Sequence, residues 1–111
     1  MECVFCKIIN KELPAEIVYE DEKVIAFNDI KPIAPVHILI VPREHIGSVN
    51  ELREEHKELM GHMVLAASKI AQQQGISKSG YRLIFNTGYD AGQTVDHIHL
   101  HLIGGKQLPW A

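Results

Sequence analysis

Residues 95–103 read VDHIHLHLI, and this stretch decides how the rest of the chain is interpreted. Successive side chains of a β-strand point to opposite faces, so His97, His99 and His101 would share one face at a spacing of roughly 6.5–7 Å. The residues between them are apolar and would share the other face. The pattern predicts a strand whose apolar face packs on the core and whose imidazoles line a solvent-reachable groove.

The other segments predict an α+β domain with an antiparallel sheet packed on one long helix. Asn50–Gln74 carries apolar residues mostly three and four positions apart, and Gly75 follows as a C-terminal stop. The predicted apolar face comprises Leu52, Leu59, Met63, Leu65, Ala66 and Ile70. A short helix is predicted at 5–13, ended by Pro14, and strands at 16–21, 23–29, 36–42, 81–86 and 97–103. The alternative, a parallel βαβ arrangement, needs more crossover helices than this order offers.

Composition places the chain among ordinary globular proteins. Its 111 residues fit one domain spanning 1–111, with 46% hydrophobic and 23% charged residues. No apolar run approaches the ~20 residues that cross a membrane, and no secretory signal is evident at the start, so a cytoplasmic location is expected. The net charge of −3 argues against nucleic-acid binding but allows a small anionic ligand.

The three histidines of the strand have two alternative uses. Neutral imidazoles are good zinc ligands, so a His-x-His pair with a third ligand would make a catalytic metal site. In the other interpretation, an imidazole nitrogen attacks phosphorus while its neighbours tune and protonate it. The preceding loop, 86–94, offers Asn86, Gln93, Thr94 and glycine-freed N–H groups, which are donors suited to phosphate oxygens. This loop favours the nucleophilic interpretation.

HIHLHLI at 97–103 matches the signature of the histidine triad superfamily, in which alternating histidines are separated and followed by apolar residues. The blocks 6–46 and 86–110 resemble its nucleotide-binding branch over essentially the whole chain. The resemblance implies a five-stranded antiparallel sheet with two helices, continued into a ten-stranded sheet across a homodimer. It also implies hydrolysis at the α-phosphorus of purine nucleoside phosphoramidates, with no cofactor needed for catalysis.

By the same resemblance, His99 is the nucleophile that forms a nucleotidyl-histidine intermediate. His101 contacts the phosphate and the leaving group, to which it donates a proton, while His97 and His37 support the site. The polar loop residues Asn86, Gln93 and Thr94 bind the phosphate or leaving group; Thr94 stands where many members have serine.

The resemblance also implies a nucleotide-binding slot. Asp29 accepts hydrogen bonds from the ribose hydroxyls, and the apolar residues around the base are Phe5, Ile8, Phe27 and Leu39, with Val4 at the edge. From spacing alone, each of these four is interpreted as core and Asp29 as a turn residue, because apolar periodicity cannot distinguish a base slot from packing.

Cys3 and Cys6 are too close in sequence to join distant parts of the chain, and two ligands do not complete a tetrahedral site. Some bacterial histidine triad proteins bind a structural zinc through such a pair and two histidines, and the matching positions here are Cys3, Cys6, His45 and His97. The resemblance therefore implies a structural zinc whose loss lowers the melting temperature more than turnover.

Three other functions stay open at this point. The chain could be a nucleotide-binding module that acts through a protein partner, or a dinucleoside polyphosphate hydrolase of the same superfamily. A metallohydrolase that uses the three strand histidines as ligands is the third alternative. The C-terminal segment with Trp110 resembles the part that reaches across the dimer in the phosphoramidase branch, which favours that branch. The expected partners are a purine nucleotide or nucleoside phosphoramidate and a second copy of the chain, with no nucleic acid and no membrane.

Overall fold

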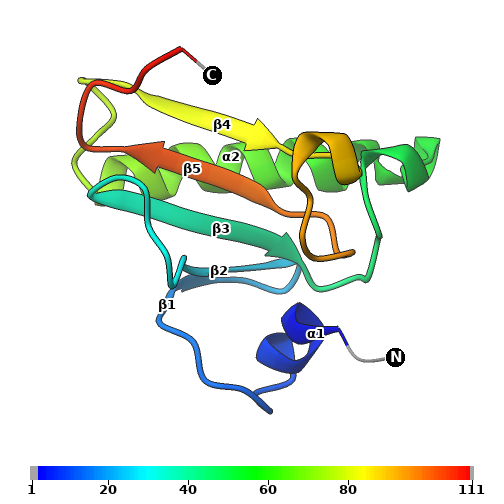
Figure 1. The fold of residues 1–111 in the computed structure, drawn as a ribbon. Coiled ribbons are helices and arrows are strands. Elements are labelled where there is room, and N and C mark those ends of the chain that lie inside the picture. The colour runs from blue at the N-terminus through cyan, green and yellow to red at the C-terminus, as the bar shows by residue number, and fades with distance from the viewer. Residues whose placement is uncertain (1–2, 111) are drawn as a thin grey trace.

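The computed structural model describes residues 3–110, so both ends of the predicted 1–111 domain lie outside the described residues. Two helices and five strands follow one another along the chain (Figure 1). They are α1 (Val4–Ile9), β1 (Ile17–Glu20), β2 (Val24–Asn28), β3 (Val36–Pro42), α2 (Lys57–Gln73), β4 (Tyr81–Phe85) and β5 (Leu100–Gly104). The predicted α+β class and element order are confirmed.

The five strands form one sheet in the order β1-β2-β3-β5-β4. Every neighbouring pair is antiparallel, so the parallel alternative is wrong. β3 and β5 lie side by side near the middle, with Leu39 opposite His101 and Ile40 opposite Leu100. This register brings His37, which sits on β3, close to the histidine segment.

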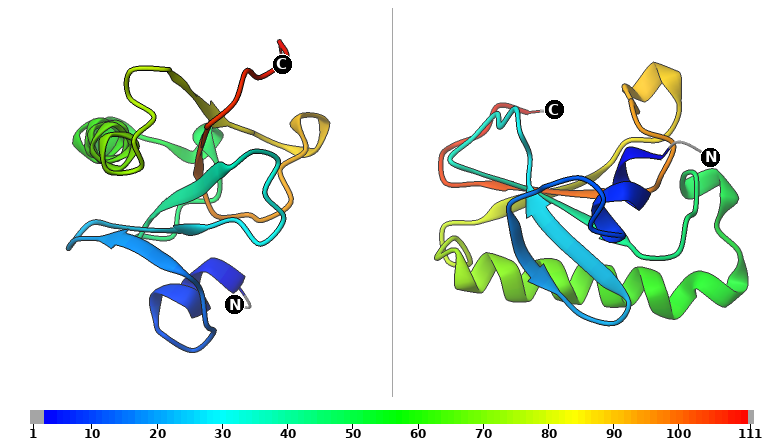
Figure 2. Two further views of the ribbon diagram at one scale, coloured as in Figure 1. Left: turned by 90° about the vertical axis from the view of Figure 1, so that its left-hand side faces the viewer. Right: turned by 90° about the horizontal axis from the view of Figure 1, so that it is seen from below.

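α2 covers one face of the sheet, and α1 lies on the opposite side (Figure 2). The alternation of β5 sends Leu100 and Leu102 toward α2, as predicted. The core on this face combines strand residues Val24, Ala26, Ile38, Ile40, Leu100 and Leu102 with helix residues Met63, Ala66, Ala67, Ile70 and Ala71. The opposite face is thereby left for α1 and for the imidazole of His101.

The long helix begins later than the predicted Asn50. Two 3₁₀ turns, Val49–Glu51 and Glu54–His56, precede α2 at Lys57. His56 Nδ1 accepts the Arg53 N–H at 2.9 Å, which closes the second turn locally. The end is as predicted: Gly75 has φ of 75°, the left-handed conformation that glycine adopts without strain.

Leu65 was predicted on the buried face of this helix and is 71% exposed. It lies two positions after the fully buried Met63, which turns its side chain about 200° around the helix axis. The helix residues that pack on the sheet include Met63, Ala66 and Ile70 instead. Among residues 3–110, the helices lack the combination of length and hydropathy that crossing a bilayer requires.

The short N-terminal helix ends at Ile9, before the predicted 13. Lys11 has φ of 63°, so the chain turns out of the helix there, and Leu13 is 38% exposed. Phe5 and Ile8 are buried against Ile25 and Phe27 on the sheet face opposite α2. α1 is therefore a short cap over the end of the sheet where the histidines lie.

The histidine strand is shorter than the predicted 97–103, because β5 begins at Leu100. Its partner β3 ends at Pro42, which has no N–H to donate to a ladder. The Pro42 carbonyl instead accepts from His97 Nε2 at 2.8 Å, and the Ile98 N–H donates to the Ile46 carbonyl at 2.6 Å. These two hydrogen bonds fix the segment before β5, which has no regular strand pairing.

Candidate active site

A cavity of about 350 Å³ opens beside α1 on the face opposite α2. Eight of the nine residues predicted to bind a nucleotide line it: Val4, Phe5, Ile8, Phe27, Asp29, Leu39, Asn86 and Thr94. His99 and His101 also line it. The cavity thus has an apolar part under α1 and a polar part at the histidines, a combination typical of a small-molecule site.

Gln93 is the predicted binding residue that does not line the cavity. Its Oε1 accepts the Gly88 N–H at 2.8 Å, and its Nε2 donates to the Gly47 and Val95 carbonyls at 2.8 and 2.9 Å. Every polar atom of the Gln93 amide is therefore used to shape the loop. Its observed contacts are those of a residue that ties the loop to Gly47 and Val95 rather than one that faces the cavity.

Sequence reasoning missed several lining residues, namely Pro14, Ala15, Asn28, Ile30, Gly92 and Val95. Ile30 is 92% exposed and stands at the mouth. A hydrophobic side chain directly after Asp29, in a turn between two strands, was the available signal for it. Pro14 was interpreted as a helix stop, and nothing in its sequence context indicates a second role.

His99 is held in one orientation. It is 7% exposed, and its Nδ1 lies 2.8 Å from the His97 carbonyl. A carbonyl can only accept, so Nδ1 carries the ring proton and donates it. The ring of Phe5 packs nearly perpendicular to that of His99, with centroids 5.1 Å apart. In the neutral ring, Nε2 therefore keeps its lone pair, the atom needed for nucleophilic attack.

His101 pairs with His37, the fourth predicted histidine of the site. The His37 Nε2 and His101 Nδ1 atoms are 2.9 Å apart, and His37 Nε2 is also 3.4 Å from Asp29 Oδ2. Burial, together with the neighbouring His99 and His37 rings, lowers the pKa of His101 to about 4. Burial also lowers the pKa of His37, against the opposing charge of Asp29. Both rings are consequently neutral at neutral pH.

Asp29, His37 and His101 also lie close enough together to be considered as metal ligands. However, the Ile33 main-chain N–H donates to His37 Nδ1 at 3.2 Å, which leaves the ring proton on Nε2. A protonated nitrogen cannot ligate a metal. The hydrogen bonds therefore describe a donor chain from Ile33 through His37 to His101 rather than a metal centre.

The three strand histidines do not converge on one point. His97 Nδ1 faces the cysteines, His99 Nδ1 faces a carbonyl, and His101 Nδ1 faces His37. Within residues 3–110, no ligand cluster contains all three rings. This arrangement does not favour the interpretation of His97, His99 and His101 as one catalytic zinc site.

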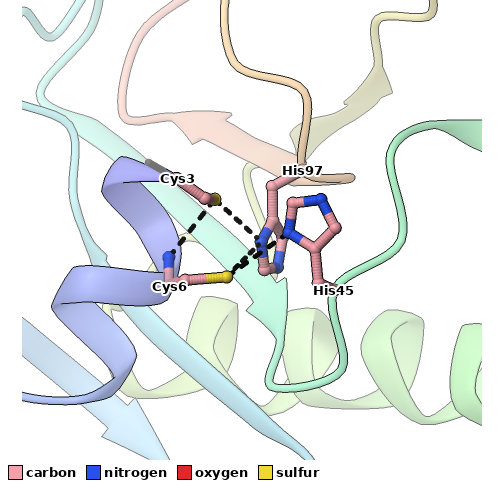
Figure 3. Close-up of side chains that lie close together, drawn as sticks. All are labelled: Cys3, Cys6, His45 and His97. Carbon is pink, nitrogen blue, oxygen red and sulfur yellow. Dashed lines mark hydrogen bonds between the residues drawn. The ribbon is translucent and has the colours of Figure 1, made fainter. Parts of the chain in front are cut away.

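Cys3, Cys6, His45 and His97 point toward one another at the N-terminus of α1 (Figure 3). His97 Nδ1 lies 3.3 Å from Cys3 Sγ and 3.6 Å from Cys6 Sγ, and His45 Nδ1 lies 3.3 Å from Cys6 Sγ. In a tetrahedral zinc site with Zn–S of about 2.3 Å and Zn–N of about 2.0–2.1 Å, sulfur and nitrogen are about 3.6 Å apart. The four side chains therefore fit a zinc ion with little movement.

The protonation of this group also suits a cation. His97 is fully buried and donates from Nε2 to the Pro42 carbonyl, which leaves a lone pair on Nδ1 beside the sulfurs. Burial, followed by the neighbouring Cys3, raises the pKa of the Cys6 thiol. A metal ion would offset this by stabilising the thiolates. The described residues thus contain a possible metal-binding cysteine and histidine group.

Comparisons with known proteins show which proteins this chain is similar to. Residues 2–109 match the family model described as scavenger mRNA decapping enzyme C-term binding. The chain is 52% identical over 107 residues to the purine nucleoside phosphoramidase of Escherichia coli K12, covering 96% of this chain and 90% of that protein. A HIT family hydrolase from Legionella pneumophila superposes with a TM-score of 0.97 at 48% identity, covering 98% of this chain and 97% of that one. A zinc-bound histidine triad family protein from Mycobacterium smegmatis superposes with a TM-score of 0.81 at 33% identity, covering 96% and 76%.

Proposed function

The chain belongs to the histidine triad superfamily, and on that premise we propose that it hydrolyses the bond to the α-phosphorus of purine nucleoside phosphoramidates through a nucleotidyl-histidine intermediate. The observation that carries the proposal is the orientation of His99, whose Nδ1 is committed to the His97 carbonyl while its ring lines the cavity. The 52% identity to a purine nucleoside phosphoramidase supports the choice of substrate class.

The cavity offers a separate place for each part of a nucleotide. Phe5, Ile8 and Leu39 form an apolar slot for the purine base. Asp29 Oδ1 accepts the Lys31 N–H at 2.8 Å, which fixes the carboxylate at the mouth, where it can accept hydrogen bonds from both ribose hydroxyls. The α-phosphate then lies at the polar end.

At that polar end, Asn86 and Thr94 face the cavity together with His99 and His101. Their amide and hydroxyl groups donate to the non-bridging oxygens of the phosphate. Preorganised donors of this kind stabilise the charge that builds up on those oxygens as phosphorus is attacked.

In the first step, His99 Nε2 attacks the phosphorus and the phosphorus–nitrogen bond of the substrate breaks. The departing amine takes the proton of His101 Nε2–H, because an amide anion is a prohibitive leaving group. This leaves His101 as an imidazolate, whose Nδ1 accepts the His37 Nε2–H. In the second step, water attacks the nucleotidyl-histidine, His101 Nε2 receives the water proton, and the nucleoside monophosphate is released with His99 restored. Two displacements remove the need to align water and leaving group at once.

The direct test is hydrolysis of an AMP conjugate of a primary alkylamine. We expect the purified protein to release AMP and the amine at unchanged rate after brief EDTA treatment, because no metal takes part in the chemistry. A chain that binds AMP but does not cleave the conjugate would support the nucleotide-binding module instead. Activity lost in EDTA and restored by zinc would support the metallohydrolase.

We further propose that Cys3, Cys6, His45 and His97 hold a structural zinc ion. The near-tetrahedral spacing of their ligand atoms supports this, as does the zinc-bound histidine triad relative. When bound, zinc would tie α1 to the segment before β5 and fix the backbone of His97, whose carbonyl orients His99. Reduced thiols at both cysteines also fit the cytoplasmic location that we propose.

Removing this ion should affect stability more than turnover. We expect about one equivalent of zinc in protein purified without chelator, and Cys6→Ser should lose it and melt about 10 °C or more lower, since each kcal/mol lost moves the melting temperature by several degrees. Turnover should fall by less than about tenfold, because no ligand touches the reacting atoms. Elemental analysis and a thermal melt measure both, with His62→Ala as a histidine control outside the group. A zinc content under about a tenth of an equivalent in the wild type would contradict the proposal.

We also propose that two chains pair through β4 into a ten-stranded sheet. β4 is an edge strand whose Leu83 is 36% exposed, and Trp110 in the C-terminal segment is 93% exposed. Unpaired edges of this kind readily take a further strand. Light scattering should give twice the 12.5 kDa of one chain, and Leu83→Asp should shift the mass toward one chain. A wild-type mass of 12.5 kDa would contradict the dimer.

A further inference from the structure

A main-chain group outside the cavity contacts the histidine pair of the site. The Ile33 N–H donates to His37 Nδ1 at 3.2 Å, in the turn that joins β2 to β3. His37 is 6% exposed, so this bond is shielded from water. Ile33 itself does not line the cavity, and its side chain is 61% exposed.

This N–H favours one tautomer of His37. A peptide N–H can only donate, so His37 Nδ1 has to be the bare nitrogen, and the neutral ring carries its proton on Nε2. His37 Nε2–H then donates to His101 Nδ1 at 2.9 Å. His101 Nδ1 is therefore also bare, and the proton of the neutral His101 ring is on Nε2.

The opposite arrangement would leave the leaving group without a proton. If His37 carried its proton on Nδ1, its Nε2 would accept from His101 Nδ1–H, and His101 Nε2 would be bare. The His37–His101 hydrogen bond would be equally good in both arrangements. Two neighbours of His37 break this symmetry. A proton on Nδ1 would place two donors against each other at the Ile33 N–H, and a bare Nε2 would face the Asp29 carboxylate, whose Oδ2 is 3.4 Å away and can only accept.

The turn holds the N–H in place without using the Ile33 side chain. Pro32 and Pro35 flank it, and their fixed φ angles stiffen the segment. On either side, Asp29 and His37 are joined by a main-chain hydrogen bond from Asp29 N to the His37 carbonyl at 2.9 Å. The position of the N–H is therefore set by the backbone of the turn and does not depend on the Ile33 side chain.

We propose that the main-chain N–H of Ile33 is a positioning group that keeps the proton of His101 on Nε2, where the departing amine collects it. The inference rests on the proposed hydrolysis for its consequence in catalysis. The tautomers of His37 and His101 are a property of the folded protein and can be observed without turnover.

The first experiment reads the tautomers by nitrogen NMR of histidine-labelled full-length protein near neutral pH. We expect His37 and His101 both to be protonated on Nε2 in the wild type. Replacing Ile33 by its α-hydroxy acid analogue turns the N–H into an ester oxygen and keeps the side chain. We expect both protons to shift from Nε2 toward Nδ1, while the Asp29 contact with His37 Nε2 retains part of the wild-type tautomer. Nδ1 protonation of His37 in the wild type, or unchanged tautomers in the ester variant, would overturn the proposal.

The second experiment compares two leaving groups, an alkylamine that needs a proton and a nitrophenolate that does not. In the ester variant and in Ile33→Pro, the ratio of kcat for the AMP alkylamide to kcat for the AMP nitrophenyl ester should fall about tenfold, the size expected from losing one buried hydrogen bond. Ile33→Ala keeps the N–H and should keep the wild-type ratio. An equal fall on both substrates, or an unchanged ratio, would overturn the proposal.

The two readouts separate this inference from the proposed function. A wild-type chain that cleaved neither substrate would contradict the hydrolysis. The nitrogen spectra would still support or overturn the role of Ile33, because they depend only on the folded protein.

Discussion

Replacing His99 by asparagine should lower kcat for an AMP alkylamide by about four orders of magnitude, the usual size of effect when a covalent nucleophile is removed. Asparagine keeps a polar side chain near the His97 carbonyl but has no nitrogen lone pair that can attack phosphorus. The apolar slot and Asp29 are untouched, so the Kd for AMP should change by less than about threefold. Rapid-quench kinetics and calorimetric titration measure the two quantities.

The matched control for this variant is His62→Asn, on α2. His62 Nε2 contacts Asp21 Oδ2 at 2.8 Å, on the sheet face away from the cavity, so the same substitution there should leave kcat near the wild-type value. A nucleotidyl-enzyme that is stable in base and labile in acid, as a phosphorus–nitrogen bond to histidine is, should be trapped with the wild type and absent in His99→Asn. Residual activity within about tenfold of the wild type in His99→Asn would point to a water-only mechanism and contradict the covalent intermediate.

Replacing His101 by asparagine should give a loss that depends on the leaving group. General acid catalysis typically contributes about 10²–10⁴-fold, and this whole factor should be lost on the AMP alkylamide. A nitrophenolate leaves without a proton, so the AMP nitrophenyl ester should lose less than about tenfold. Steady-state rates on both substrates give the two factors.

The His101→Asn variant also tests whether His101 donates a proton or only binds the phosphate. If His101 acted mainly by binding the phosphate, both substrates would slow by the same factor, and the proton-donor assignment would be wrong. Because burial keeps the pKa of His101 at about 4, the ring stays neutral at neutral pH in the wild type. The difference between substrates should therefore persist across the neutral pH range.

The sheet and the cluster of histidines could be predicted because both depend on strand alternation. Leu100 and Leu102 pack toward α2, and His101 lies on the other side beside His37, as a period of two requires. The cysteine and histidine group came from matching four positions to a known pattern, and the structure brings all four together. Sequence spacing alone could not have joined Cys3 to His97.

The base slot could not be separated from core packing by sequence. Phe5, Ile8, Phe27 and Leu39 are 4–8% exposed, close to the values of ordinary core residues, and they line a cavity while also packing on Ile25 and Val41. Apolar periodicity indicates only that a side chain is buried. The same apolar side chains can be covered by other parts of the protein or by a ligand. Asp29 likewise fits both interpretations, since one carboxylate oxygen caps the turn through Lys31 and the other approaches His37.

The least predictable features are those set by main-chain atoms. The orientation of His99 depends on the His97 carbonyl, that of His97 on the Pro42 carbonyl, and that of His37 on the Ile33 N–H. Every residue carries such groups, so no residue type marks them in a sequence. The late start of α2 has a similar origin in the local bond between His56 and Arg53.

α1 has only six residues and borders both of the proposed ligand sites. Cys6, and Cys3 just before the helix, belong to the proposed zinc site, while Val4, Phe5 and Ile8 line the cavity proposed to hold the nucleotide. An ion that holds this helix and a purine that packs beneath it act on the same rigid body, so their binding equilibria are thermodynamically linked. Reciprocity then requires that whatever factor zinc adds to nucleotide affinity, the nucleotide adds to zinc affinity.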